Sequence, residues 1–145
     1  MSAKATAIAE AVIAQLQAGT WPLAFTPTLA RARVLDAATD LASLQVTVSP
    51  QGRSLARGDR GSNLATYTVS IFLQQAAGEQ AVEEAILDTA EAIADALAGN
   101  RLAVLPEALV REVRHEPLFS VEQLREKGIL TTVLVLTIEQ YETRN

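Results

Sequence analysis

Helical periodicity marks two stretches of the chain. Residues 4 to 18 place Ile8, Val12 and Leu16 four positions apart, and residues 78 to 100 carry a longer apolar stripe. Side chains four residues apart lie on one face of a helix, so both stretches predict an amphipathic α-helix. The longer stripe contains Val82, Ile86, Ala90, Ile93 and Leu97.

Alternation of apolar and polar residues marks the strands. It is cleanest at residues 44 to 50 and 65 to 75, and looser at 29 to 36 and 109 to 119. Successive side chains of a strand point to opposite faces of the sheet, so these stretches predict half-buried strands. Residues 129 to 142 begin with a continuous apolar run, which predicts a central strand that is buried on both faces.

A short helical turn at residues 37 to 44 and a short helix at 120 to 128 complete the predicted elements. Helices and strands in this order predict an α+β fold. We expect a mostly antiparallel sheet of about four to five strands with helices packed on one face. A length of 145 residues suits one domain, so residues 1–145 are expected to form a single domain.

The segment between the two clean strands is unusually long. Residues 50 to 63 are expected to form a long mobile hairpin loop, because ordinary hairpin loops have about 2–5 residues. Arg53, Arg57 and Arg60 outweigh Asp59 here, although the whole chain has a net charge of −5. Arginine forms paired hydrogen bonds with carboxylates, so these four residues are candidate contacts to a partner.

The triplet Arg57-Gly58-Asp59 also matches a cell-adhesion signal. Adhesion is disfavoured because the sequence has no cysteine and no recognisable export signal. The N-terminal stretch resembles a signal peptide, but Glu10 interrupts its apolar run. No run approaches the ~20 apolar residues of a membrane span. We therefore expect a protein made in the cytoplasm that does not bind a membrane.

Catalytic chemistry has little support in the sequence. His115 is the only histidine and there is no cysteine, so neither a zinc site nor a catalytic triad is expected. No phosphate-binding glycine motif is present. We predict that the protein is not an enzyme and uses no cofactor. The acidic residues of the second predicted helix lack basic neighbours, and they form either a solvated face or a surface for a basic partner.

Three stretches together resemble a known family. They are "FTPTLARARVLDAATDLASLQVTVSP", "ATYTVSIFLQQ" and "HEPLFSVEQLREKGILTTVLVLTIEQY", separated by the arginine-containing segment and the acidic helix. In this order they resemble the small neck proteins of tailed bacteriophages, which are called tail terminator or tail completion proteins. The resemblance covers most of the chain and depends on element order and loose patterns.

The resemblance implies a structural role in the virion tail or neck. Such proteins form a ring, probably in six copies, at the head-proximal end of the tail tube, where the ring stops tube growth and meets the head connector. The expected partners are further copies of the chain, the tail tube protein and the head-completion protein. DNA is expected to pass through without specific binding, which a net negative charge favours. The segment from Pro50 to Asn63 would contact neighbouring subunits or the tube.

Two alternatives remain open from the sequence. One is another neck or tail-tube component. The other is a soluble adaptor or small-ligand-binding α+β domain, with a pocket near Phe72 or in the region of Trp21 and Phe25.

Overall fold

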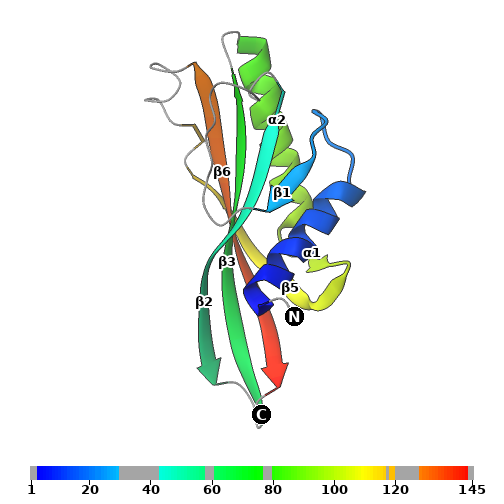
Figure 1. The fold of residues 1–145 in the computed structure, drawn as a ribbon, viewed down its shortest axis with the longest axis vertical. Coiled ribbons are helices and arrows are strands. Elements are labelled where there is room, and N and C mark those ends of the chain that lie inside the picture. The colour runs from blue at the N-terminus through cyan, green and yellow to red at the C-terminus, as the bar shows by residue number, and fades with distance from the viewer. Residues whose placement is uncertain are drawn as a thin grey trace.

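The computed structural model describes residues 3–29, 43–57, 61–76, 80–116, 118–119 and 128–143. Two helices and six strands lie in these ranges (Figure 1). In chain order they are α1 (Lys4–Ala18), β1 (Pro27–Leu29), β2 (Gln45–Arg57), β3 (Ser62–Ala76), α2 (Gln80–Leu97), β4 (Arg101–Leu102), β5 (Leu105–His115) and β6 (Ile129–Thr143).

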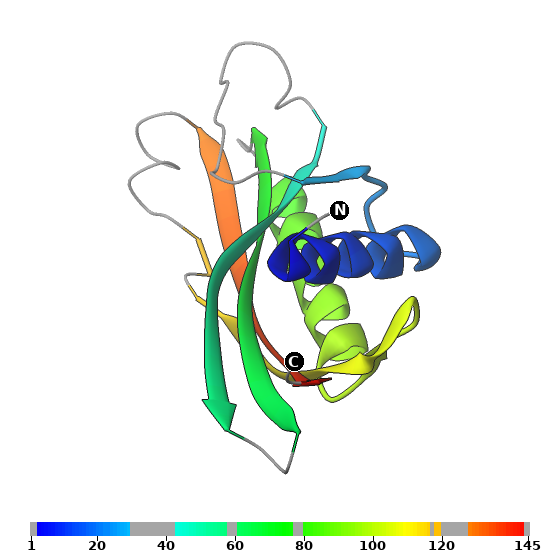
Figure 2. The same cartoon turned by 60° about the horizontal axis from the view of Figure 1, so that its bottom comes forward.

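The six strands form one mixed sheet in the order β1-β2-β3-β6-β5-β4. β1 pairs parallel with β2, and the other neighbours pair antiparallel. The sheet curls into a half-barrel, and the two helices lie inside the curl (Figures 1 and 2). The predicted fold, a mostly antiparallel sheet of four to five strands with helices packed on one face, is wrong. The sheet has six strands, contains a parallel pair and curls around the helices.

Two features account for the curl. β3 and β6 are each 15 residues long, and strands of this length accumulate a large right-handed twist. β-Bulges also interrupt the register between Pro50 and Gly52 in β2 and between Val110 and Glu112 in β5. A bulge bends its strand and increases the local twist, so both sides of the sheet turn around the helices.

The predicted apolar faces of the helices are confirmed. Ile8, Val12 and Leu16 of α1 are buried, as are Ile86 and Ile93 of α2. They join one hydrophobic cluster with the inward side chains of the long strands. The cluster takes Tyr67, Val69, Ile71 and Leu73 from β3 and Leu134, Leu136 and Ile138 from β6. β6 lies between β3 and β5, so its predicted central position is also confirmed.

The long hairpin loop is not present as predicted. β2 continues to Arg57 and β3 begins at Ser62, so most of residues 50 to 63 lie in two paired strands. The bulge at Pro50 explains the difference, because it breaks the sequence alternation without ending the strand. Residues 58–60 lie outside the described part of the chain.

The two short edge strands have no counterpart among the predicted elements. β1 has three residues and β4 has two, which is too short for a periodic pattern. Of the strand predicted at residues 29 to 36, the structure describes only Leu29, at the end of β1. The predicted helical segments at 37 to 44 and 120 to 128 lie almost wholly outside the described residues.

Gly19 provides a test of how α1 is joined to the sheet. A methyl group at this position would overlap the ring of Trp21, which is held by a 2.8 Å hydrogen bond from Nε1 to the Leu16 carbonyl. We expect Gly19→Ala to lower the free energy of unfolding by about 1–3 kcal/mol, the usual cost of overpacking. Urea denaturation would measure the change.

Gly52→Ala is the matched control. A methyl group there would meet only the Cβ atom of Thr68, at 4.0 Å, so this variant should be neutral or slightly stabilised. Equal stability of the Gly19 and Gly52 variants would contradict this description of the α1 junction.

Candidate functional site

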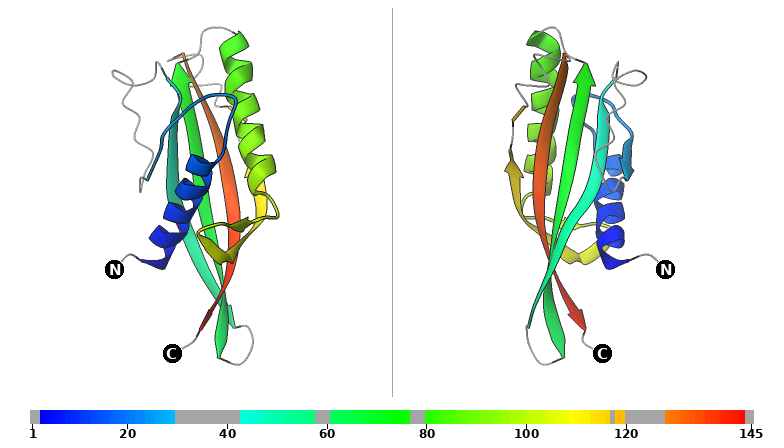
Figure 3. Two further views of the ribbon diagram at one scale, coloured as in Figure 1. Left: turned by 90° about the vertical axis from the view of Figure 1, so that its right-hand side faces the viewer. Right: turned by 60° about the vertical axis from the view of Figure 1, so that its left-hand side comes forward.

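One end of the sheet extends past the helices. We call this end the arm: residues 53–57 of β2, 62–67 of β3 and 138–143 of β6. It continues below α1 in Figure 1 and is seen from two further sides in Figure 3. All residues of β2 from 51 to 57 are exposed, in contrast to the buried valines earlier in the same strand. The arm is thus bare along β2, while Ala65, Tyr67, Ile138 and Glu142 of its other two strands stay buried.

The bulge in β2 decides which side chains face inward on the arm. Before it, Val48 lies beside Ile71 of the core face. After it, Arg53 lies beside Tyr67 and Leu55 beside Ala65, so odd-numbered residues of β2 now share the face of the buried side chains of β3. The extra residue therefore places Arg53 and Leu55 on the inner face of the arm.

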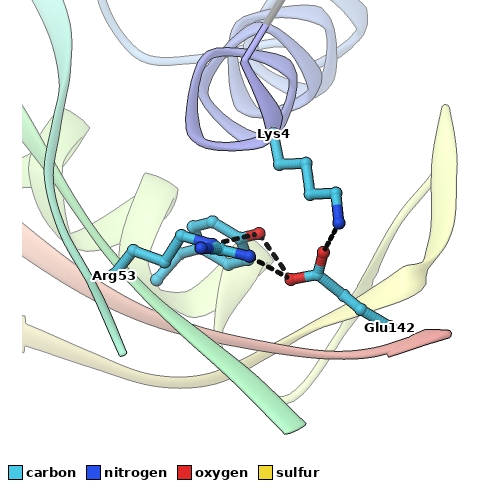
Figure 4. A network of polar contacts seen from close by, with 4 residues as sticks. Lys4, Arg53 and Glu142 are labelled. Carbon is cyan, nitrogen blue, oxygen red and sulfur yellow. Dashed lines mark hydrogen bonds and ion pairs between the residues drawn. The ribbon is translucent and has the colours of Figure 1, made fainter. Parts of the chain in front are cut away.

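A buried carboxylate lies at the centre of a polar network on this face (Figure 4). Glu142 is only 7% exposed. Its Oε1 accepts hydrogen bonds from the Tyr67 hydroxyl at 2.8 Å and from Arg53 Nη2 at 3.2 Å. Its Oε2 pairs with Lys4 Nζ at 2.6 Å. Arg53 Nε also donates to the Tyr67 hydroxyl at 3.1 Å, so these four side chains form one connected network.

The surroundings of Glu142 favour its ionised form. Burial raises the pKa of this carboxyl, but hydrogen bonds from Lys4, Tyr67 and Arg53 outweigh burial and bring the pKa below its ordinary value of 4.5. Burial raises the pKa of the Tyr67 hydroxyl, which stays protonated and able to donate. A general base works best with a pKa near neutrality, so this carboxylate is suited to holding cations rather than to moving protons.

The network joins parts of the chain that are far apart in sequence. Lys4 is the first residue of α1, Arg53 belongs to β2, and Glu142 lies near the end of β6. The guanidinium carbon of Arg53 also lies 5.7 Å from the centre of the Tyr67 ring, a cation–π arrangement. The network therefore fixes the base of the arm against the start of the first helix.

The four sequence-predicted site residues have different surroundings. Arg53 is a member of the network and contacts its own chain. Arg57 is exposed at the end of β2, where its backbone pairs with Asn63, and its side chain makes no hydrogen bond or ion pair to another described residue. Asp59 and Arg60 lie outside the described residues. Lys4, Tyr67 and Glu142 were not predicted as site residues. Strand register brings Tyr67 and Glu142 together, and the packing of α1 on the sheet adds Lys4.

The outer face of the arm has a small hollow. Its volume is about 120 Å³, and Leu64, Leu109 and Tyr141 form its apolar part. An ion pair lies beside it, in which Arg111 donates from Nε to Glu139 Oε1 at 2.6 Å. This hollow is smaller than the ~300–1,000 Å³ of ordinary ligand pockets, so it suits a single side chain of a partner.

The region of Trp21 and Phe25 is also hollowed. The two rings stack with their centres 6.5 Å apart, and a depression of about 240 Å³ lies against them. Both residues pack against the core cluster, as anchors of the segment after α1 would. The depression is the structural feature closest to the sequence-based alternative of a ligand-binding domain.

The only histidine lies at the end of β5. His115 Nε2 is hydrogen-bonded to the Thr132 hydroxyl, and the ring is half-buried. Burial lowers the pKa of His115, while Glu91 of α2 raises it by a smaller amount. Glu84, Glu91 and Asp95 of α2 are exposed, so the described part of the acidic helix presents carboxylates to solvent.

Among the described residues, no group of three or more histidine, cysteine, aspartate or glutamate side chains is arranged to hold a metal ion. No described helix is long and apolar enough to span a membrane.

Of the comparisons with known proteins, the one with solved structures found a match. No family model matches the chain, and no curated protein matches it. Among solved structures, it is similar to a chain from the virion of a native gene transfer agent (GTA) particle. The similarity covers 97% of this chain and 100% of that chain, with a TM-score of 0.61 and 19% sequence identity. The two chains therefore share a fold over their full lengths.

Glu142→Gln tests the network. The variant keeps the shape of the side chain but removes the charge that Lys4 and Arg53 share, and we expect unfolding at pH 7 to become easier by about 1–3 kcal/mol. Glu139→Gln is the control, because Glu139 pairs with Arg111, whose side chain is 63% exposed. Such a pair contributes at most ~1 kcal/mol. Equal losses in the two variants would contradict a special role for Glu142.

The pH dependence of unfolding gives a second test. The folded-state pKa of Glu142 is lowered, so its contribution is present above the ordinary value of 4.5 and is lost as the pH falls through the folded-state pKa. The stability difference between the natural chain and Glu142→Gln should therefore shrink below pH 4.5. Urea denaturation at a series of pH values measures it, and a difference that stays constant into acid would contradict the network.

Proposed function

We propose that this chain is a structural protein of a phage-like virion. The single observation that carries the proposal is the similarity of fold, over 97% of this chain and 100% of the other, to a chain from a gene transfer agent virion. The expected location is accordingly the virion.

The more specific role that we propose is that of a tail terminator. In this role, copies of the chain form a ring at the head-proximal end of the tail tube and join it to the head connector. The order of the sequence stretches that resemble tail terminators supports this role. Their described parts belong to β1 and the first half of β2, to β3, and to the end of β5 and β6.

The arm supplies a surface on which such a ring can be built. Its strands are already ordered by pairing with β3, so little conformational entropy is lost when a partner binds. Leu55 is 50% exposed and Arg57 carries an unpaired charge among the described residues. The exposed acids of α2 offer a complementary surface on a neighbouring copy.

Two other roles compete with this one. Another neck or tail-tube component would agree equally well with the observed fold. A ligand-binding domain is favoured by two open depressions, one of about 240 Å³ beside Trp21 and Phe25 and one of about 340 Å³ that Phe25, Leu44 and Gln45 help to line. Only the larger one reaches the usual ~300 Å³ of ligand sites.

Charge reversal on the arm tests the ring. The double variant Arg57→Glu with Arg60→Glu should remain folded, because Arg57 has no partner among the described residues, but it should no longer form rings. Circular dichroism would check the fold. Light scattering after size-exclusion chromatography, together with negative-stain electron microscopy, would count the copies.

The charge-conserving variant Arg57→Lys with Arg60→Lys is the control, and it should retain assembly. Rings that persist after charge reversal would contradict the docking role of these arginines. A natural chain that never assembles would contradict the ring itself.

A further inference from the structure

The arm has an open edge on β2. β1 covers this edge only where Pro27–Leu29 pairs with Val46–Val48. Beyond the bulge, no described strand lies on the side of β2 that faces away from β3, and residues 51–57 are all exposed. The backbone N–H and C=O groups that point away from β3 are thus free to pair with a strand of another chain.

This edge is only partly protected against pairing, by the bulge at Pro50 and by the charges of Arg53 and Arg57. Register with β3 is regular from Arg53, opposite Tyr67, to Arg57, opposite Asn63. Residues 51–57 contain neither proline nor lysine, and Leu55 is half-exposed. Natural proteins normally guard edges with such residues, bulges or short strands. Beyond the bulge the edge is regular and exposed, so it is able to accept a strand of another chain.

The opposite margin of the sheet has a second open edge, on β5. β4 covers its lower part. This cover is extended by a backbone hydrogen bond from the Gly99 N–H to the Val110 carbonyl and by another from the Val110 N–H to the Asn100 carbonyl. Beyond Val110 no other described strand lies on this side of β5. Arg111, Glu112 and Arg114 are exposed there.

The two open edges are complementary. β2 runs in the direction of β6 and β5 runs against it, so the edges are antiparallel to each other. Each margin is covered on one half by a very short strand and open on the other half. The open half of β2 lies toward the arm tip, and that of β5 lies away from it.

We propose that β2 of one copy pairs antiparallel with β5 of the next copy, with Arg53 opposite His115 and Ala56 opposite Glu112. This inference rests on the proposed ring-forming function and specifies how the copies join. The register pairs residues 53–56 with residues 112–115 and matches the sheet faces, while Arg57 falls beside Arg111 in the β5 bulge. Leu55 falls beside Val113 on the inner face, and Ser54 falls beside Arg114 on the outer face.

The short strands do not obstruct this pairing. In the same register, β1 of the copy that supplies β2 lies beyond His115 of the copy that supplies β5. β4 of the copy that supplies β5 lies beyond Arg57 of the copy that supplies β2. Each margin is therefore covered where the neighbouring copy is not expected to pair.

The stagger of the two edges fits a closed ring. Leu55 of β2 pairs with Ala65 of β3, which pairs with Gln140 of β6. Val113 of β5 pairs with Leu136, four residues earlier on β6. Four residues span about 13 Å along a strand. The four strands β2, β3, β6 and β5, together with the spacing to the next copy, take up about 19 Å across the sheet. The ratio gives a strand tilt of about 35°, at the lower end of the ~35–45° of β-barrels. A head-to-tail contact closes into a ring when its rotation closes, and a strand tilt in this range is what a closed ring of strands needs.

Cysteine cross-linking tests the register directly, because the chain has no cysteine of its own. Ser54→Cys combined with Arg114→Cys places one thiol on each edge, at exposed positions of the outer face. Rings formed by this variant, mildly oxidised and run on a denaturing gel without reductant, should give a ladder that extends beyond dimers. The reductant should collapse the ladder to monomer.

Each single-cysteine variant should give dimers at most. Ser54→Cys combined with Glu107→Cys should also stop at dimers, because Glu107 lies on the part of β5 beside β4. Rings that are seen by electron microscopy but give no ladder would overturn the strand pairing and leave the proposed function standing. A chain that stays monomeric at all concentrations would overturn both.

Discussion

The unbroken pairing of β3 with β6 is the constraint on which the rest of this molecule depends. Fifteen residues pair without a register shift, from Ser62 opposite Thr143 to Ala76 opposite Ile129. One half of this long ladder carries the inward apolar side chains that pack on α1 and α2. The other half continues past the helices as the arm, so a single pair of strands links the hydrophobic core to the exposed surface.

An arm without its own core needs another source of rigidity, and the Glu142 network supplies it. Burying a carboxylate is costly unless it is paired and hydrogen-bonded, and three side chains from α1, β2 and β3 meet this requirement here. The network occupies the place where the apolar cluster ends. A fixed arm presents an open strand edge in one orientation, which is what repeated contact between identical copies requires.

The local pattern of the sequence predicted most of the core, and the long-range features were beyond it. Ile8, Val12 and the inward residues of β3 follow from periodicity alone. Pro50 and Gly52 looked like the start of a loop, whereas tertiary pairing turned them into a bulge. Lys4 and Glu142 meet from opposite ends of the chain, and Ser49 is buried although its polarity predicted exposure. Such contacts depend on sheet order and curl, which no local pattern encodes.

Electron microscopy of particles made with and without this gene tests the central claim most directly. A tail terminator stops the tube and joins it to the head. Without the gene, we therefore expect full heads that lack tails and separate tails of irregular length. Restoring the gene should restore joined particles with tails of uniform length. Particles that look normal without the gene would contradict the claim, and the protein would not be a component of the neck.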